Sequence, residues 1–345
     1  MITVFTLCSA NYLAHAKTLG DSLAEHNPDF HFVIGLVDRL PEKIAPSFWH
    51  PYELIPVEDL DIPGFWEMAR QYDLVELNMS VKPSYMEYLY RRDPSARAVI
   101  YLDPDILVCS SFKALIDKLQ TYNVIVTPHS CTFDNSPTNK YYEGGMLTTG
   151  IYNLGFLATS RSEITFAFLD WWQNRLRDHC YFRQGEGGFG DQLWMNLAPL
   201  YFSGVHVEKN PGYNMCYWNH FERSLTRQGG RHLVNGKYDL IFYHFSSYSP
   251  ARPDAVTARV KSVTMSFSER PDLRPIYDDY RVRLLSAGYD LVRSLPYAIP
   301  RRAPGSDLTL KDATKETIRL ILRLLPTSLQ TLLQRLAQLT ANSLK

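Results

Sequence analysis

Apolar residues along the first 250 positions follow two spacings, one typical of buried strands and one typical of amphipathic helices. Short apolar and β-branched runs predict strands over residues 2–7, 31–37, 52–57, 98–102, 124–126, 151–158 and 240–243. Apolar residues three and four positions apart predict helical segments over residues 13–26, 112–120, 163–177 and 191–197. This alternation predicts a mostly parallel, doubly wound α/β sheet flanked by helices, in which ligands bind beyond the carboxyl ends of the strands.

The pattern changes after Pro250, where Arg and Pro become frequent and strand-like runs stop. We therefore expect a sheet domain over residues 1–250, a helical extension over 251–300 and a basic amphipathic tail over 301–345. In the tail, basic residues recur at every fourth position from Lys311 to Arg323, beside a stripe of leucines. Such a segment either lies on an anionic bilayer or packs against protein. Contact of residues 307–345 with a membrane and contact with a second subunit both stay open.

Composition narrows the class of protein. The 345 residues contain 36 Lys and Arg and 36 Asp and Glu, which argues against a nucleic-acid partner, because such binding needs a basic excess. Five scattered cysteines without a C-x-x-C pair predict neither a disulfide framework nor a zinc site. The N-terminal residues lack the basic start of a signal peptide, and no apolar run reaches the roughly 18 residues of a membrane span. We expect a cytoplasmic protein, with peripheral attachment to the inner face of the cytoplasmic membrane through the tail left open.

The strongest local motif is the pair Asp103 and Asp105, which follows the predicted strand at residues 98–102. The same spacing occurs at Asp59 and Asp61, but in a polar stretch that predicts a solvated loop. Two carboxylates at a ligand-binding sheet edge repel each other and call for a counter-ion. Mg²⁺ or Mn²⁺ fits, because both prefer oxygen ligands and bridge carboxylates to substrate phosphates. The alternative is a strand-end turn in which Asp105 caps the next segment.

A histidine, His244, leaves the last predicted strand. A lone histidine beside apolar residues is more often a buried structural group than a ligand. If this strand ends near Asp103, however, a neutral imidazole completes a site of two carboxylates and one nitrogen. Such a set shifts the preference from Mg²⁺ towards Mn²⁺.

Several segments, in this order along the chain, carry a resemblance to a known family. They are Phe5-Thr6 through Asn11-Tyr12, Tyr101-Leu102-Asp103-Pro104-Asp105, Tyr152-Asn153-Leu154-Gly155, Gly190-Asp191-Gln192 through Asn196, and His244-Phe245. Over roughly residues 1–250, the chain resembles the GT-A-type glycosyltransferases of family 8, which include glycogenin and bacterial lipopolysaccharide galactosyl- and glucosyltransferases.

The resemblance implies a GT-A fold, a Rossmann-like, mostly parallel twisted sheet with a helical C-terminal extension. It implies a metal-dependent hexosyltransferase that uses a nucleoside-diphosphate sugar, in the first place a UDP-hexose, a glycan or lipid-linked acceptor, and retention of configuration. Asp103, Asp105 and His244 would then bind Mn²⁺ or Mg²⁺, and Asp191 and Gln192 would be catalytic. The donor-binding residues that it implies are Thr6, Cys8, Asn11, Tyr12, Lys82, Asp103, Asn153 and Gly155.

The chain departs from the family pattern at two places. Ser246-Ser247-Tyr248 stands where family members carry Gly and then Lys-Pro-Trp, so Lys82 is the candidate for contact with the diphosphate, with an exposed lysine at a helix start as the alternative. Cys8-Ser9-Ala10 replaces residues that are commonly aspartates near the uracil. The base of the donor is therefore less strongly implied than the diphosphate.

The reaction path and the class of protein keep their alternatives. A double displacement would use Asp191 as nucleophile, and an inverting path would need a base such as Asp134, Glu143 or Glu186. A metal-dependent sugar nucleotidyltransferase would need a glycine-rich loop after the first strand, and residues 7–13 contain no glycine. A catalytically inactive nucleotide-sugar-binding subunit is the remaining alternative.

Two further segments have two interpretations each. The glycines from Gly185 to Gly190 predict a mobile loop that positions Asp191 rather than a dinucleotide fingerprint, because no strand precedes them. An aromatic run beside Asn214, Asn219 and His220 either stacks against sugar rings or packs in the core. Its members are Tyr213, Tyr217, Trp218 and Phe221.

Overall fold

The computed structural model describes residues 1–133, 135–182, 188–257 and 266–299. The predicted tail over 301–345 lies outside these residues. So do the candidate bases Asp134 and Glu186 and most of the predicted glycine loop. No helix in the described part of the chain combines the length and the apolar character needed to cross a bilayer.

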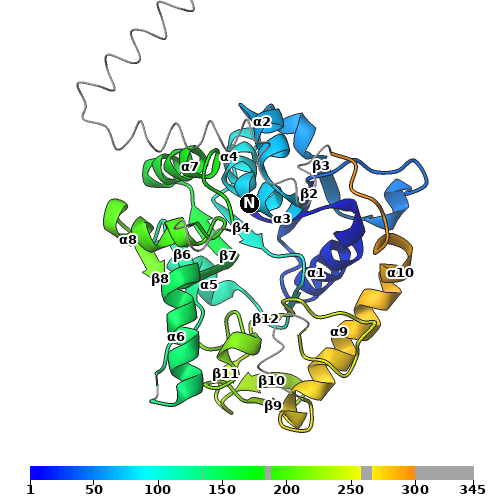
Figure 1. Ribbon diagram of the computed structural model, residues 1–345, viewed down its shortest axis with the longest axis vertical. Helices are drawn as coiled ribbons and strands as arrows, with labels where there is room; N and C mark the ends of the chain where they lie inside the picture. Colours follow the sequence, from blue (N-terminus) through cyan, green and yellow to red (C-terminus); the bar gives the residue numbers. More distant parts are fainter. Residues whose placement is uncertain (134, 183–187, 258–265, 300–345) are drawn as a thin grey trace, which may run out of the picture. The chain divides into compact units, whose positions relative to one another are not determined.

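Among the described residues, seven strands form the central sheet in the order β3-β2-β1-β4-β7-β6-β8 (Figure 1). Their bounds are β1 Ile2–Cys8, β2 His31–Leu36, β3 Glu53–Pro56, β4 Ala98–Leu102, β6 Val124–Pro128, β7 Tyr152–Ser160 and β8 Val205–Val207. Neighbouring strands run parallel except β7, which is antiparallel to both β4 and β6. The predicted mostly parallel α/β sheet is confirmed.

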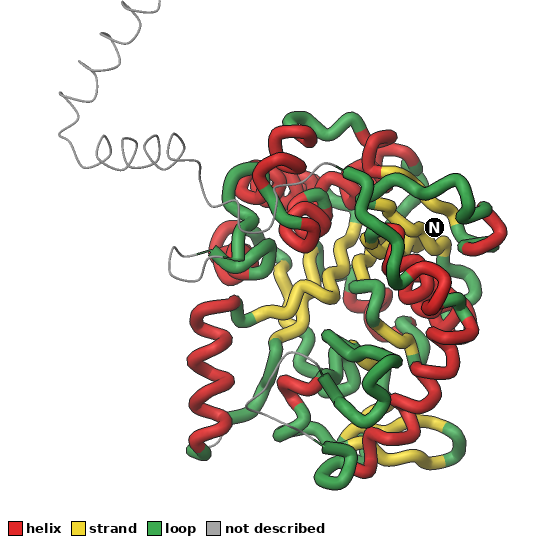
Figure 2. Tube along the Cα trace, turned by 45° about the vertical axis from the view of Figure 1, so that its right-hand side comes forward, coloured by secondary structure: helices red, strands yellow, loops and turns green. Residues whose placement is uncertain are grey.

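Helices lie on both sides of this sheet (Figure 2). Their bounds are α1 Leu13–His26, α2 Phe65–Gln71, α3 Leu74–Ser80, α4 Lys82–Arg92, α5 Lys113–Lys118, α6 Pro137–Thr149, α7 Glu163–Leu176, α8 Ala198–Tyr201, α9 Arg274–Ser286 and α10 Tyr289–Val292. Residues of α2, α3, α4 and α7 pack into one apolar core, and residues of α1 and α5 pack into another. The segment predicted as helical over 191–197 is a 3-10 helix at Leu193–Leu197, which continues into α8.

Side-chain alternation explains why the strands separate two cores. In β1, Phe5 and Leu7 point into the core that contains α4 and α7. Ile2 and Val4 point into the core that contains α1. Successive side chains of a strand face opposite sides, so a strand covered on both faces is apolar throughout. Because all strands of the central sheet except β7 run in the same direction, their carboxyl ends lie at one edge of the sheet.

Two smaller sheets complete the described structure. Strands β9 (Leu225–Gln228), β10 (Arg231–Val234) and β11 (Tyr238–Asp239) are antiparallel, and β5 (Ile106–Val108) pairs with β12 (Phe242–His244). The strand predicted at 240–243 begins two residues later, at Phe242, because Leu240 and Ile241 do not pair with β5. Helices α9 and α10 lie within the predicted extension and share a third core with β12.

Candidate metal and donor site

The acidic pair lies where β4 leaves the central sheet. The Asp103 backbone N–H donates to the Gly155 carbonyl at 2.8 Å, the last tie between β4 and β7. The chain then turns, and β5 begins at Ile106. Because β12 pairs antiparallel with β5, His244 lies opposite Ile106, and the Phe245 N–H donates to the Asp105 carbonyl at 2.8 Å. This pairing brings the histidine next to the two acids.

The three side chains converge. His244 Nε2 lies 3.1 Å from Asp105 Oδ1 and 3.6 Å from Asp103 Oδ2, and one ligand atom from each residue lies within 4.8 Å of the others. The imidazole is buried, while the Asp103 and Asp105 side chains keep 31% and 19% exposure, so the cluster opens towards a ligand. The predicted convergence is confirmed. Asp59 and Asp61, with the same spacing, are exposed as expected of a solvated loop.

Because Gly155 has no side chain, the His244 and Asp103 side chains of the cluster can lie close to its Cα. A Cβ on this residue would lie 2.5 Å from His244 Cε1, 2.8 Å from Asp103 Oδ2 and 2.9 Å from Asn153 Oδ1. Contacts below 3 Å with three atoms of different residues leave no room for any side chain. Two carboxylates and an imidazole are also the donor set that Mn²⁺ accepts. The residues present therefore fit a divalent cation.

The surroundings of the cluster favour the ionised form of Asp105. Burial alone raises the pKa of Asp105, but a proton on His244 that is shared with this carboxylate, with a smaller effect from a protonated His15, reverses the rise, so that the pKa of Asp105 lies below the ordinary value while no cation is bound. The Tyr101 hydroxyl donates to Asp103 Oδ1 at 2.6 Å and fixes that carboxylate. Both acids are thus held ready to bind a cation with their oxygens.

A buried ion pair lies beside the cluster. Helix α4 begins at Lys82, whose Nζ lies 2.5 Å from Asp191 Oδ2 and donates to the Leu154 carbonyl at 2.9 Å. Both side chains are almost fully buried, so the alternative of an exposed lysine is wrong, and the contact of Lys82 with the diphosphate stays a prediction. Burial raises the pKa of Asp191, and the ammonium of Lys82 opposes that rise. The Lys82 ammonium also lies 4.1 Å from the centre of the Tyr101 ring, which links the pair to Asp103.

Comparison with known proteins gives distant likenesses. No protein-family model matches the chain. The uncharacterized protein YfnF of Bacillus subtilis (strain 168) is 25% identical over 246 residues, which are 70% of this chain and 80% of that protein. The crystal structure of the galactosyltransferase LgtC in complex with donor and acceptor sugar analogues matches with a TM-score of 0.47 and 16% identity, over 86% of this chain and 98% of that one. The glycosyltransferase GlyE of Streptococcus pneumoniae TIGR4 matches with a TM-score of 0.47 and 15% identity, over 84% and 64%. These values are too low to assign an activity.

The residues expected to bind the nucleoside lie on and after β1. Thr6 and Cys8 are buried within the strand, and burial raises the pKa of the Cys8 thiol. Asn11 and Tyr12 belong to the 3-10 helix Ala10–Tyr12, where Tyr12 is 40% exposed and its ring stacks on His15 at 4.3 Å. Only Tyr12 and Asn11 therefore present side chains towards solvent, and the donor roles of all four stay predictions.

The second member of the predicted catalytic pair holds the chain locally. Gln192 donates to the Thr149 carbonyl at 2.7 Å, at the end of α6. Nearby, the Ile151 N–H donates to Asn196 Oδ1 at 2.9 Å. These bonds join the segment after Asp191 to the start of β7, which carries Asn153 and Gly155. The candidate base Glu143 is half-buried on α6.

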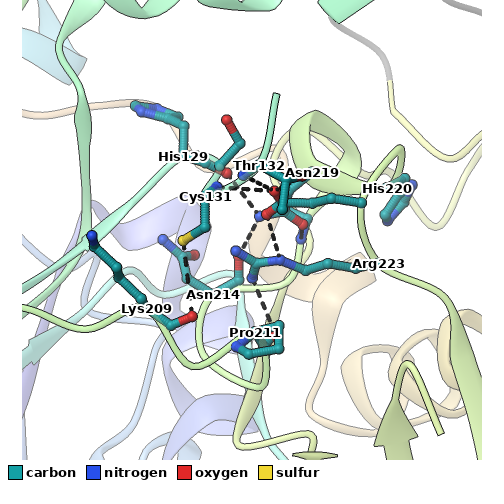
Figure 3. A network of polar contacts seen from close by, with 12 residues as sticks. His129, Cys131, Thr132, Lys209, Pro211, Asn214, Asn219, His220 and Arg223 are labelled. Carbon is teal, nitrogen blue, oxygen red and sulfur yellow. Dashed lines mark hydrogen bonds and ion pairs between the residues drawn. The ribbon is translucent and has the colours of Figure 1, made fainter. Parts of the chain in front are cut away.

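A polar network ties the loop after β6 to the segment 209–223 (Figure 3). The Cys131 and Thr132 N–H groups donate to the Glu222 carboxylate at 2.9 and 2.7 Å. Asn219 Nδ2 donates to the carbonyls of His129 and Asn214 at 3.0 and 2.9 Å, and its oxygen accepts from the Cys216 N–H. The network thereby fixes the backbone of Asn214.

Sequence reasoning missed Tyr101 as a partner of Asp103, the role of Asn214, and His129, whose ring Nε2 lies 3.5 Å from Asn153 Nδ2. His129 follows the buried strand β6 as Asp103 follows β4, so its position at a strand end was the available indication. Within the aromatic run, Tyr213 packs between Phe156 and Phe242, which is the core interpretation.

Proposed function

We propose that this chain is a metal-dependent glycosyltransferase that moves a hexose from a UDP-hexose to a glycan or lipid-linked acceptor with retention of configuration. The observation that carries the proposal is the convergence of Asp103, Asp105 and His244 at the ligand-binding edge of an α/β sheet. The resemblance of the surrounding motifs to family 8 glycosyltransferases supports the donor class. The cytoplasmic location and the contacts of residues 307–345 stay predictions.

Different residues of the site would bind the cation and the donor. Asp103 and Asp105 would hold Mn²⁺ or Mg²⁺ through their oxygens and His244 through Nε2, while Tyr101 orients the Asp103 carboxylate. A divalent cation bound there supplies Lewis-acid stabilisation of the charge that develops on the departing diphosphate. Gly155 leaves the room that His244 and Asp103 need to lie side by side. Thr6, Cys8, Asn11, Tyr12 and Asn153 would hold the nucleoside and sugar.

The pair formed by Lys82 and Asp191 serves the sugar side of the reaction. Lys82 binds Asp191 Oδ2, so we assign Asp191 the electrostatic stabilisation of the positive charge that develops at the anomeric carbon rather than nucleophilic attack. Gln192 positions the segment that carries Asp191. The acceptor hydroxyl then attacks from the face that the diphosphate leaves, and its proton passes to a diphosphate oxygen.

The test is the release of nucleoside diphosphate by the full chain from UDP-, GDP- and TDP-sugars with Mn²⁺. We expect turnover with a UDP-sugar, and a fall of roughly 100-fold or more in Asp103→Asn and Asp105→Asn, since each loses a full charge facing the cation. Asp59→Asn in the exposed pair of equal spacing is the matched control and keeps full activity.

Three outcomes contradict the proposal. Unchanged turnover in both site variants makes the acidic pair structural. Release of pyrophosphate from UTP and a sugar 1-phosphate identifies a nucleotidyltransferase instead. Binding of Mn²⁺ and UDP-sugar without any hydrolysis or transfer identifies an inactive binding subunit.

A further inference from the structure

Asn214 is a buried residue in an uncommon backbone conformation beside the proposed metal site. It has no exposed surface, and its φ of +54° lies in the left-handed region, which asparagine tolerates better than most residues. The next residue, Met215, accepts from the His244 N–H at 2.9 Å. The backbone of Asn214 is thus held next to β12, and such conformations persist where the surroundings enforce them.

The hydrogen bonds of Asn214 start from a donor whose identity is certain. The Gly155 backbone N–H can only donate, and it donates to the side-chain atom of Asn153 at 3.2 Å, which must therefore be the oxygen. The Asn214 side-chain atom at 2.9 Å from this oxygen must in turn be the NH₂ group, which also lies 3.0 Å from Thr127 Oγ1. The amide of Asn214 is thereby oriented by the network rather than by assumption.

The orientation of Asn214 decides the tautomer of His244. The remaining atom of the amide, Oδ1, lies 3.2 Å from His244 Nδ1. Because Oδ1 can only accept, Nδ1 must carry a hydrogen, and the neutral ring then has its lone pair on Nε2. Nε2 faces Asp105 and Asp103 at 3.1 and 3.6 Å. An Nε2 lone pair at these distances from two carboxylates is favourable only if a positive charge lies between them: a proton while no cation is bound, or a cation that takes the place of that proton on binding.

We infer that Asn214 is the positioning residue of the metal site: it fixes the His244 tautomer and directs the Nε2 lone pair at the cation. The inference rests on the metal site of the proposed function and adds to it a residue that makes no contact with metal or substrate. Asn153 has a role in this arrangement as well. Its oxygen accepts from both the Gly155 N–H and the Asn214 NH₂ group, and so fixes which way the Asn214 amide is turned. Strand β7 and the histidine that would bind the cation are thus linked by one chain of hydrogen bonds.

The experiment measures Mn²⁺ binding to the full chain without donor. Asn214→Gly removes the amide and suits the positive φ, and Asn214→Ser makes a smaller change with the same loss of reach to His244 Nδ1. Asn235→Gly is the matched control, because Asn235 has a φ of 53° and its side chain makes three hydrogen bonds, two with Ser224 and one with Glu222. The dissociation constant comes from the electron paramagnetic resonance signal of free Mn²⁺, and electron spin echo modulation detects an imidazole nitrogen bound to the ion.

We expect Asn214→Gly and Asn214→Ser to weaken Mn²⁺ binding by about 10- to 100-fold, the usual effect of losing an outer-sphere partner, and to reduce the nitrogen modulation. Asn214→Asp retains an acceptor for Nδ1–H and keeps that modulation, and Asn235→Gly binds as the unaltered chain does. Unchanged affinity and modulation in Asn214→Gly or Asn214→Ser overturn the inference, as does loss of the modulation in Asn214→Asp. If the unaltered chain itself binds Mn²⁺ without nitrogen modulation, or not at all, the proposed metal site fails and this inference with it.

Discussion

Gly155→Ala is a single methyl group added at the centre of the proposed site. Its Cβ would lie 2.5 Å from His244 Cε1, 2.8 Å from Asp103 Oδ2 and 2.9 Å from Asn153 Oδ1. Ordinary contact begins near 3.5 Å, so the ligands must move by roughly 0.5–1 Å. Overpacking of this kind costs about 1–3 kcal/mol. If the strain is relieved by displacing Asp103 and His244, Mn²⁺ affinity falls by about 10- to 100-fold, at 1.4 kcal/mol for each factor of ten.

The matched control is Gly35→Ala in β2. Its Cβ would lie 2.5 Å from Leu7 Cδ2 and 2.7 Å from Tyr85 Cε1, a clash of equal depth within the apolar core. We expect both variants to lose stability to a similar extent in urea unfolding, and only Gly155→Ala to lose Mn²⁺ affinity in the resonance titration. Equal Mn²⁺ affinity of the two variants would refute the assignment of Asp103 and His244, which contact Gly155, as the ligands of the cation.

Two further predictions concern buried charges. Lys82→Met leaves Asp191 buried without its partner and should lower the free energy of unfolding by about 3–5 kcal/mol, less at pH 5 than at pH 8, because the unpaired acid takes up a proton as the pH falls. Urea unfolding of this variant and of Lys82→Met/Asp191→Leu measures the effect. The double variant should recover most of the lost free energy of unfolding, because it no longer buries an unpaired charge. A loss below about 1 kcal/mol in the single variant contradicts the pairing. Burial lowers the pKa of His220 to about 3 from 6.5, with Arg270 adding to the effect. As the pH falls, His220 therefore takes up a proton in the unfolded chain before it does so in the folded chain. Below pH 6.5 this difference lowers the free energy of unfolding by up to about 1.4 kcal/mol for each pH unit. In His220→Gln, the free energy of unfolding measured in urea should fall less steeply between pH 6.5 and 5 than in the unaltered chain. An equally steep fall would show that other groups cause the loss of stability.

Long strands of the fold were predictable because both of their faces are buried. β1, β2 and β4 were predicted to within one residue at each end, since their apolar residues alternate between two cores without a break. The missed strands have four residues or fewer, and all of them except the buried β5 are partly exposed. In β8, for example, Val205 to Val207 are all half-buried, and three residues show no period that separates a strand from a loop. Their pairing comes from tertiary contacts that sequence patterns do not contain.

The site was predictable in part for the same reason. Asp103 and Asp105 follow a strand whose end the sequence marks, so their place at the sheet edge follows from the fold class. The approach of His244 depends on the pairing of β5 with β12, two strands of three residues each that lie far apart in the chain. The burial of Lys82 and the orientation of Asn214 depend on contacts with Asp191 and Asn153, and no spacing in the sequence indicates either.

The charges of the site explain why a divalent rather than a monovalent cation fits. Asp103, Asp105 and Asp191 contribute three negative charges, and Lys82 contributes one positive charge. The hydrogen bond from Tyr101 to Asp103 and the contact of Lys82 with the Tyr101 ring make these groups one connected cluster. With a neutral His244, the cluster carries two uncompensated negative charges in a partly desolvated place, which is unfavourable until they are paired. One divalent ion would neutralise the cluster, so that the diphosphate of a donor would meet a site without net negative charge, whereas a monovalent ion would leave one negative charge to repel it.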